Sequence, residues 1–147
     1  MLLAPVQSSA EGIRADLRVD APVARVFAHV SDLHNMETWW PEHPVYRRLL
    51  GDGGPGTLYA WIYVARGVPV PGLSRVLTRD PSSRFEYHAG PPIVGFRIGY
   101  HFTAEERATR VAFWFLSPAG RFKAFGEHLV PEITRALDRL AAHLATG

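Results

Sequence analysis

The sequence predicts an α+β fold in which a curved antiparallel sheet of about seven strands wraps around one long C-terminal helix. Residues 13–20 alternate strictly between apolar and charged side chains, which is typical of a strand with one buried face. Residues 45–116 hold successive segments rich in Val, Ile, Phe, Tyr and Trp, with short turn sequences between them. After residue 121 the apolar positions change to helical spacing. Two short helices are expected between the first two strands.

The first short helix is predicted directly after the first strand. Asp20 can accept hydrogen bonds from the free amides of a first helical turn, and Pro22 fits that turn because its missing donor would be unpaired there. Val23, Val26, Phe27 and Val30 follow at spacings of three or four residues, on one face of the helix. A second short helix is expected just before the Trp39-Trp40 pair.

The remaining strands are expected at residues 45–50, 57–65, 73–79, 84–89, 95–105 and 109–116. Glycines in residues 51–56, the Asp80-Pro81 pair and the segment 106–108 supply turn chemistry between them. Because these connections are short, neighbouring strands should run antiparallel. The segment 67–72, with prolines 69 and 71, is interpreted as a hairpin loop.

The last helix is predicted from residue 121 to the end of the chain. Its apolar positions are Phe122, Phe125, Leu129, Ile133, Leu137, Leu140 and Leu144. Pro131 lies inside this run, so a kink is expected near Leu129 and Val130. The apolar stripe of this helix should cover the apolar face of the sheet, since neither surface can otherwise leave water.

Size and composition indicate one unaided domain at residues 12–147, preceded by an N-terminal tail at residues 1–11. The chain has no cysteine, which excludes disulfides and thiolate chemistry and favours a cytoplasmic location. No stretch approaches the roughly 20 apolar residues that span a bilayer, so stable membrane insertion is not expected. The 16 basic and 14 acidic residues are interspersed, without the basic stripe of a nucleic-acid-binding protein. The sequence leaves the oligomeric state open.

Metal and cofactor sites are not expected. The seven histidines form no HxH or HExxH pattern, and there is no carboxylate cluster at ligand spacing. The glycine-rich segment 51–56 lacks the Lys-Ser/Thr ending of a phosphate loop, and no serine stands in a nucleophile elbow.

Several predicted strands are apolar on both faces, which a sheet with one solvated side does not normally need. Tyr59, Trp61 and Tyr63 share one face of their strand, and Phe113 lies in the last one. These rings either fill a solid core or line a pocket with a few placed polar groups. The pocket interpretation predicts a small hydrophobic ligand.

The order of elements resembles the START-like, helix-grip superfamily SRPBCC, most of all its polyketide cyclase/dehydrase and lipid-transport branch. The resemblance covers residues 12–144. The residues that carry it are Ala21, Pro22, Val26, Phe27, Ser31, Asp32, Trp40, Pro41, Asp80, Pro81, Thr109 and Val111. It implies a ligand cavity between the sheet and the terminal helix, with the Trp pair at its edge. The alternative is that the two tryptophans plug the end of the sheet.

The predicted ligand-binding residues combine these patterns: Trp39, Trp40, Tyr59, Trp61, Tyr63, Arg75, Tyr100, Phe113, Phe125, His128 and Leu129. Arg75 shares a strand face with Leu73 and Leu77. If that face is the inner one, its guanidinium enters the cavity and could bind a carboxylate or an enolate. If Val76 faces inward instead, Arg75 is solvated. Arg75 and Tyr100 are also the candidate catalytic residues.

The favoured function is the binding of a small hydrophobic molecule, lipid-like, aromatic or polyketide-like, by a carrier or sensor. The first alternative is a polyketide aromatase or cyclase, which would fold a poly-ketone and steer proton transfer with Arg75 and a tyrosine. The second alternative is a co-factor that acts on partner proteins without a small ligand.

Overall fold

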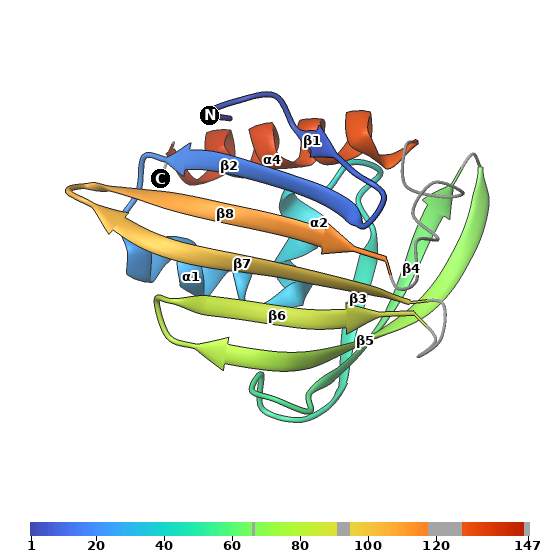
Figure 1. Ribbon diagram of the computed structural model, residues 1–147. Coiled ribbons are helices and arrows are strands. Elements are labelled where there is room, and N and C mark those ends of the chain that lie inside the picture. The colour runs from blue at the N-terminus through green and yellow to red at the C-terminus, as the bar shows by residue number, and fades with distance from the viewer. Residues whose placement is uncertain (66, 91–94, 118–127, 146–147) are drawn as a thin grey trace.

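The computed structural model describes residues 1–65, 67–90, 95–117 and 128–145, and its secondary structure confirms the predicted α+β class. One eight-stranded antiparallel sheet has the order β1-β2-β8-β7-β6-β5-β4-β3 (Figure 1). Its strands are β1 Gln7–Ser8, β2 Gly12–Val19, β3 Val45–Leu50, β4 Leu58–Ala65, β5 Val68–Asp80, β6 Arg84–Ala89, β7 Phe96–Glu105 and β8 Ala108–Leu116.

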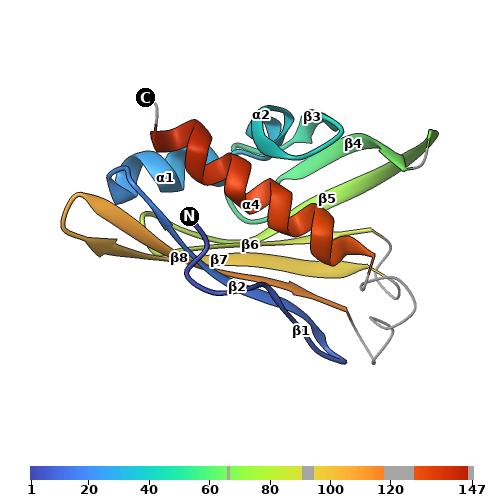
Figure 2. The ribbon, with the colours of Figure 1, turned by 90° about the horizontal axis from the view of Figure 1, so that it is seen from above.

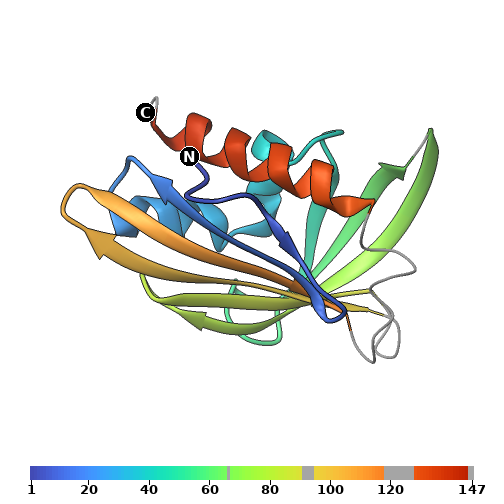
Figure 3. The ribbon, with the colours of Figure 1, turned by 45° about the horizontal axis from the view of Figure 1, so that its top comes forward.

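The helices are α1 Val23–Val30, the 3-10 turn η1 Leu33–Asn35, α2 Met36–Trp39 and α4 Leu129–Ala145. They lie on the same side of the sheet, and α4 crosses its inner face (Figure 2). The sheet curves toward α4, so that β4 and β5 rise beside the start of this helix (Figure 3). This is the helix-grip arrangement that the sequence predicts.

The N-terminal segment joins the sheet, which therefore has one strand more than expected. Gln7 pairs with Arg14 of β2, and Leu2 forms an isolated bridge with Leu17. The added strand satisfies backbone groups that the edge of β2 would otherwise leave to water.

Helix α1 forms where the sequence predicts it, and Val26, Phe27 and Val30 are buried as expected. The predicted capping role of Asp20 is wrong. Pro22 occupies the N-cap position without a side-chain cap, and Asp20 accepts a hydrogen bond from Arg18 at 3.4 Å instead.

Strand β5 is longer than predicted. The expected range was 73–79, whereas β5 starts at Val68, and residues 68–72 pair with β4 rather than forming a loop. Proline disfavours a strand because it has no backbone donor, but it is compatible with a strand position whose amide would face no partner.

The backbone geometry of β5 explains its two prolines. The carbonyl of Leu73 accepts a hydrogen bond from the Gly90 amide at 2.9 Å, on the β6 side. Backbone groups two and four residues earlier point to the same side, where β6 pairing begins only at Ser74. Pro69 and Pro71 therefore stand where the described residues contain no strand that would need their amides.

Helix α4 begins at Leu129, and residues 121–127 of the predicted helix lie outside the described residues. The described residues do not test the predicted kink near Leu129 and Val130, because α4 begins there and Pro131 lies in its first turn. The first amides of a helix have no intrahelical acceptor, so the missing donor costs nothing there. The buried stripe of α4, which includes Ile133, Leu137 and Leu140, packs against β2 and α2.

Candidate functional site

A cavity of about 580 Å³ lies between the inner face of the sheet, α2 and the first turn of α4. Its lining includes residues at the point where β5 parts from β6, and its surface is almost entirely apolar. The described residues that line it are Met36, Trp40, Pro44, Tyr46, Trp61, Tyr63, Val70, Pro71, Gly72, Leu73, Tyr87, Ala89, Gly90, Gly95, Phe96, Ile98, Phe115, Leu129 and Glu132.

Trp61 forms one wall of the cavity, and its position depends on a glycine in the neighbouring strand. Its directly paired neighbour on β5 is Gly72, and a Cβ atom at that position would overlap the indole. The ring therefore lies across Gly72, and its Nε1 donates a hydrogen bond to Ser74 Oγ at 3.0 Å. With this donor satisfied, the indole presents an apolar surface to the cavity.

Three buried phenols gather at the inner end of the cavity. Tyr46 and Tyr87 line it, and Tyr100 lies behind them with 1% of its surface exposed. Tyr87 Oη lies 3.6 Å from Met36 Sδ, to which it donates. The buried Tyr100 hydroxyl lies near Tyr87, and its geometry meets the criteria for a hydrogen bond with none of the described residues.

Burial raises the pKa of Tyr46, Tyr87 and Tyr100, because a phenolate would be poorly solvated in this interior. All three phenols therefore stay protonated across the physiological pH range. They can donate hydrogen bonds but do not act as bases.

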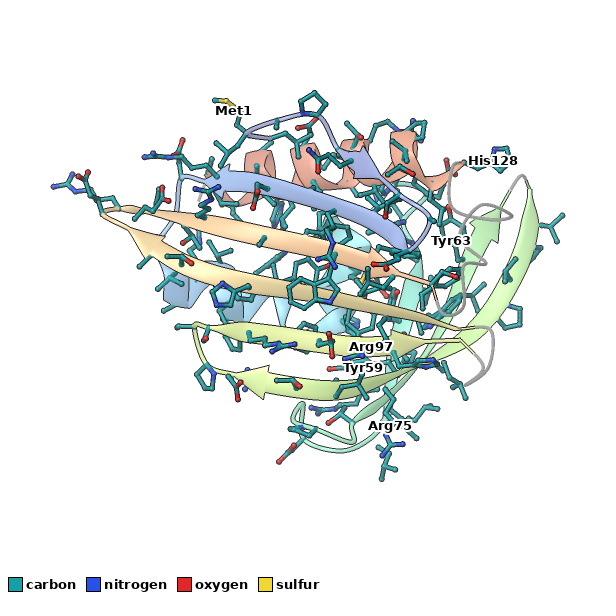
Figure 4. All side chains as sticks on the ribbon, in the orientation of Figure 1. Met1, Tyr59, Tyr63, Arg75, Arg97 and His128 are labelled. Carbon is teal, nitrogen blue, oxygen red and sulfur yellow. The ribbon has the colours of Figure 1, made fainter. Side chains whose placement is uncertain are left out.

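A tyrosine and a carboxylate meet at the opposite wall, beside the start of α4. Tyr63 on β4 donates a hydrogen bond to Glu132 Oε1, and Figure 4 shows Tyr63 beside this end of the helix. Burial raises the pKa of Tyr63, and the hydrogen bond to Glu132 and its negative charge raise it further. Tyr63 is therefore a donor, and Glu132, which is 8% exposed, is the acceptor.

The outer face of the sheet carries apolar side chains that are exposed to solvent. Ile62 and Val64 are 51% and 39% exposed there. A shallow hollow beside Ile62 shares the lining residues Trp61, Gly72 and Leu73 with the cavity. Part of the apolar excess of β4 therefore lies on the surface.

Two kinds of feature are missing from the segments that the structure describes. No three His, Asp or Glu side chains gather there in a way that would hold a metal ion. No helix in these segments has the length and hydropathy to cross a membrane.

Comparison with known proteins identifies the family. A family model described as polyketide cyclase/dehydrase and lipid transport matches residues 12–145. The chain belongs to this family. The predicted resemblance is thereby confirmed. No curated protein matches the sequence of this polyketide cyclase/dehydrase and lipid-transport family member.

Solved structures share the fold of this family member at low sequence identity. A protein from Arthrobacter aurescens has a TM-score of 0.82 at 16% identity, and the match covers 100% of this chain and 94% of that one. Protein Ms6760 from Mycobacterium smegmatis has a TM-score of 0.78 at 15% identity, covering 100% and 99%. Ara h 8.0201 has a TM-score of 0.70 at 15% identity, covering 91% and 97%. At these identities the likeness establishes the fold alone.

In this family member, the predicted ligand-binding residues that the structure describes either line the cavity, are buried elsewhere or are exposed. Trp40, Trp61, Tyr63 and Leu129 line the cavity. The buried residues that do not line it are Trp39, Tyr59, Tyr100 and Phe113. The Tyr59 hydroxyl donates to Asp32 at 3.5 Å and is thus engaged away from the cavity. Phe125 lies outside the described residues.

Two predicted site residues are exposed and do not line the cavity. Val76 is 1% exposed and takes the inner face of β5, so Arg75 lies on the outer face, where its side chain extends away from the sheet (Figure 4). The proposed entry of its guanidinium into the cavity is therefore wrong. His128 precedes the first turn of α4 and points outward (Figure 4), so it does not line the cavity.

Glu132 is the main cavity residue that sequence reasoning missed. It lies three residues after Leu129 and four before Ala136, within the buried stripe of α4. A carboxylate at a position where helical spacing calls for an apolar residue was a signal available in the sequence. Gly72 and Ser74 carried no such signal, because their importance depends on where Trp61 lies.

Proposed function

We propose that this protein binds a small hydrophobic molecule in the cavity between the sheet and the start of α4, as a carrier or sensor. The observation that carries the proposal is an apolar, aromatic-lined cavity of about 580 Å³. This volume falls within the range of about 300–1,000 Å³ that is typical of small-molecule sites. Family membership is consistent with it, since the family description includes lipid transport.

The ligand can be sought directly by denaturing the purified protein and identifying released small molecules by mass spectrometry. The compound is then titrated against the wild type and two variants. Trp61→Ala removes a cavity wall and should weaken binding by about tenfold or more, as truncation of a buried aromatic anchor typically does. Arg75→Ala is the matched control on the outer face and should bind like the wild type. Equal affinities in all three proteins would refute the cavity assignment.

The cyclase alternative retains one supporting observation, which is the pairing of the Tyr63 phenol with the Glu132 carboxylate in the cavity wall. Arg75, the cationic member of the expected machinery, is exposed and no longer supports it. Incubation with a poly-ketone chain distinguishes the two functions. A cyclised product would favour the enzyme, whereas recovery of the unaltered chain would favour the carrier.

A further inference from the structure

Glu132 is the one residue with a formal charge among the described residues that line the cavity. It is 8% exposed and forms no ion pair within the described part of the chain. An unpaired carboxylate is costly to bury in apolar surroundings, so its presence there calls for an explanation.

The position of Glu132 on α4 supplies part of that explanation. It lies in the first turn of the helix, where free backbone amides and the helix dipole favour a negative charge. The Tyr63 hydroxyl adds one hydrogen bond to Oε1. The raised pKa of Tyr63 agrees with a phenol that stays protonated beside this acceptor.

These contacts leave most of the acceptor capacity of the carboxylate unused. A carboxylate offers about four lone-pair sites, and the described residues donate one side-chain hydrogen bond to this one. The unused acceptor positions belong to a side chain of the cavity wall, so a bound molecule is the natural source of further donors.

We propose that Glu132 selects the ligand: the cavity takes an apolar molecule that carries a hydroxyl or amine donor, neutral or cationic, and rejects apolar anions such as fatty-acid carboxylates. This inference rests on the proposed function. The donor of the ligand satisfies Glu132, whereas an anion would bring like charges together in an apolar cavity where water screens them poorly.

The test uses three unbranched competitors with ten carbon atoms each: decanol, decylamine and decanoate. Each displaces the neutral fluorophore N-phenyl-1-naphthylamine from the full chain at neutral pH. Decanol and decylamine should compete at least about tenfold better than decanoate, as expected when like charges are brought together. Because it uses the wild-type protein, this comparison does not depend on whether any variant folds.

Three variants then assign the selectivity to a residue. Glu132→Gln keeps the shape of the side chain and removes its charge. The gap between the competing strengths of decanol and decanoate should therefore narrow to about threefold or less. Tyr63→Phe keeps the carboxylate and should keep the gap. Asp138→Asn removes an exposed carboxylate from the same helix and should also leave it unchanged.

The outcomes separate this inference from the function beneath it. If the fluorophore and all three competitors fail to bind the wild type, the proposed function fails. If they bind and decanoate competes as well as decanol, the cavity stands and the role of Glu132 is overturned. A gap that persists in Glu132→Gln, or closes in Asp138→Asn, overturns it equally.

Discussion

Glu86 is a buried carboxylate on the face of the sheet opposite the cavity, and it is 4% exposed. Arg97 donates to its Oε1, and Trp114 Nε1 donates to its Oε2 at 3.0 Å. The Trp114 indole covers Gly99, where a Cβ atom would overlap the ring. This cluster ties β6, β7 and β8 together through side chains as well as through the backbone ladder.

Replacing Glu86 with alanine should lower the free energy of unfolding by about 1–2 kcal/mol, because it leaves the half-buried Trp114 indole N–H without its acceptor and Arg97 without its partner. Urea denaturation monitored by circular dichroism measures the change. Glu11→Ala removes an exposed carboxylate and should be nearly neutral. A loss in Glu86→Ala no larger than in this control would contradict the assigned role.

Strand periodicity predicts correctly which side chains share a face. Trp61 and Tyr63 are two residues apart in β4, and both line the cavity. The sequence leaves Arg75 either inside the cavity or in solvent because both faces of its strand carry apolar residues, and the structure has it in solvent. The hydrogen bond from Trp61 to Ser74 shows which face is the inner one, and no sequence pattern reports such a contact.

At the level of elements, one hydrogen bond joins β8 to the start of α1. Thr109 Oγ1 donates to the carbonyl of Ala21 at 2.8 Å, and both residues are buried. Thr109→Val keeps the shape but leaves this carbonyl unpaired, which should lower the free energy of unfolding by about 1–2 kcal/mol. The matched control is Thr103→Val on the exposed face of β7. Urea titrations of both variants check the prediction, and equal losses in the free energy of unfolding would contradict it.

Helices α1 and α4 meet through two histidines whose ring centroids lie 5.0 Å apart, His29 and His143. Burial lowers the pKa of His29 from its ordinary value of 6.5; His143 and Arg25 lower it further, while Asp32 opposes them. Below pH 6.5 the unfolded chain therefore binds a proton at His29 more readily than the folded one.

Stability should accordingly fall as the pH drops below 6.5, until the folded His29 also protonates. Melting temperatures recorded between pH 8 and 5, about the span in which histidines titrate, measure this slope. His29→Gln should flatten it. His101→Gln removes an exposed imidazole and should leave the slope as it is; a wild-type slope retained in His29→Gln would refute the assignment.

Elements were predicted well from local periodicity and less well where tertiary context decides. The alternation in β2 and the spacing in α1 survive in the structure because each has one buried face. The start of β5 differs from the prediction because Pro69 and Pro71 are locally typical of a loop, and Pro131 predicts a kink where the structure has the first turn of α4. Each of these prolines stands where its missing amide has no partner to lose, which only the assembled fold reveals.

For the whole molecule, the cavity predicts that a ligand stabilises the fold by mass action. At 100 times its dissociation constant, a ligand should add about 2.7 kcal/mol to the free energy of unfolding, provided that it binds only the folded state. That corresponds to a rise in melting temperature of roughly 5–10 °C for a chain of this size. Thermal unfolding with the co-purified compound measures the rise.

Filling the cavity should abolish this rise. Ala89 lines the cavity, so Ala89→Phe places a ring inside it, whereas Ala60→Phe adds the same ring to the outer face of β4. The first variant should lose the thermal response and the second should keep it. A full response in Ala89→Phe would show that the ligand binds elsewhere.

The two prolines of β5 have a consequence for the wall of the cavity between β5 and β6. Adjacent strands tend to pair wherever both can exchange backbone hydrogen bonds, and the start of β5 lies beside the end of β6. Because Pro69 and Pro71 have no N–H to donate toward β6, the ladder of hydrogen bonds between the two strands stops near Leu73. The separation of these two strands beside the cavity is therefore fixed by the covalent structure of the chain.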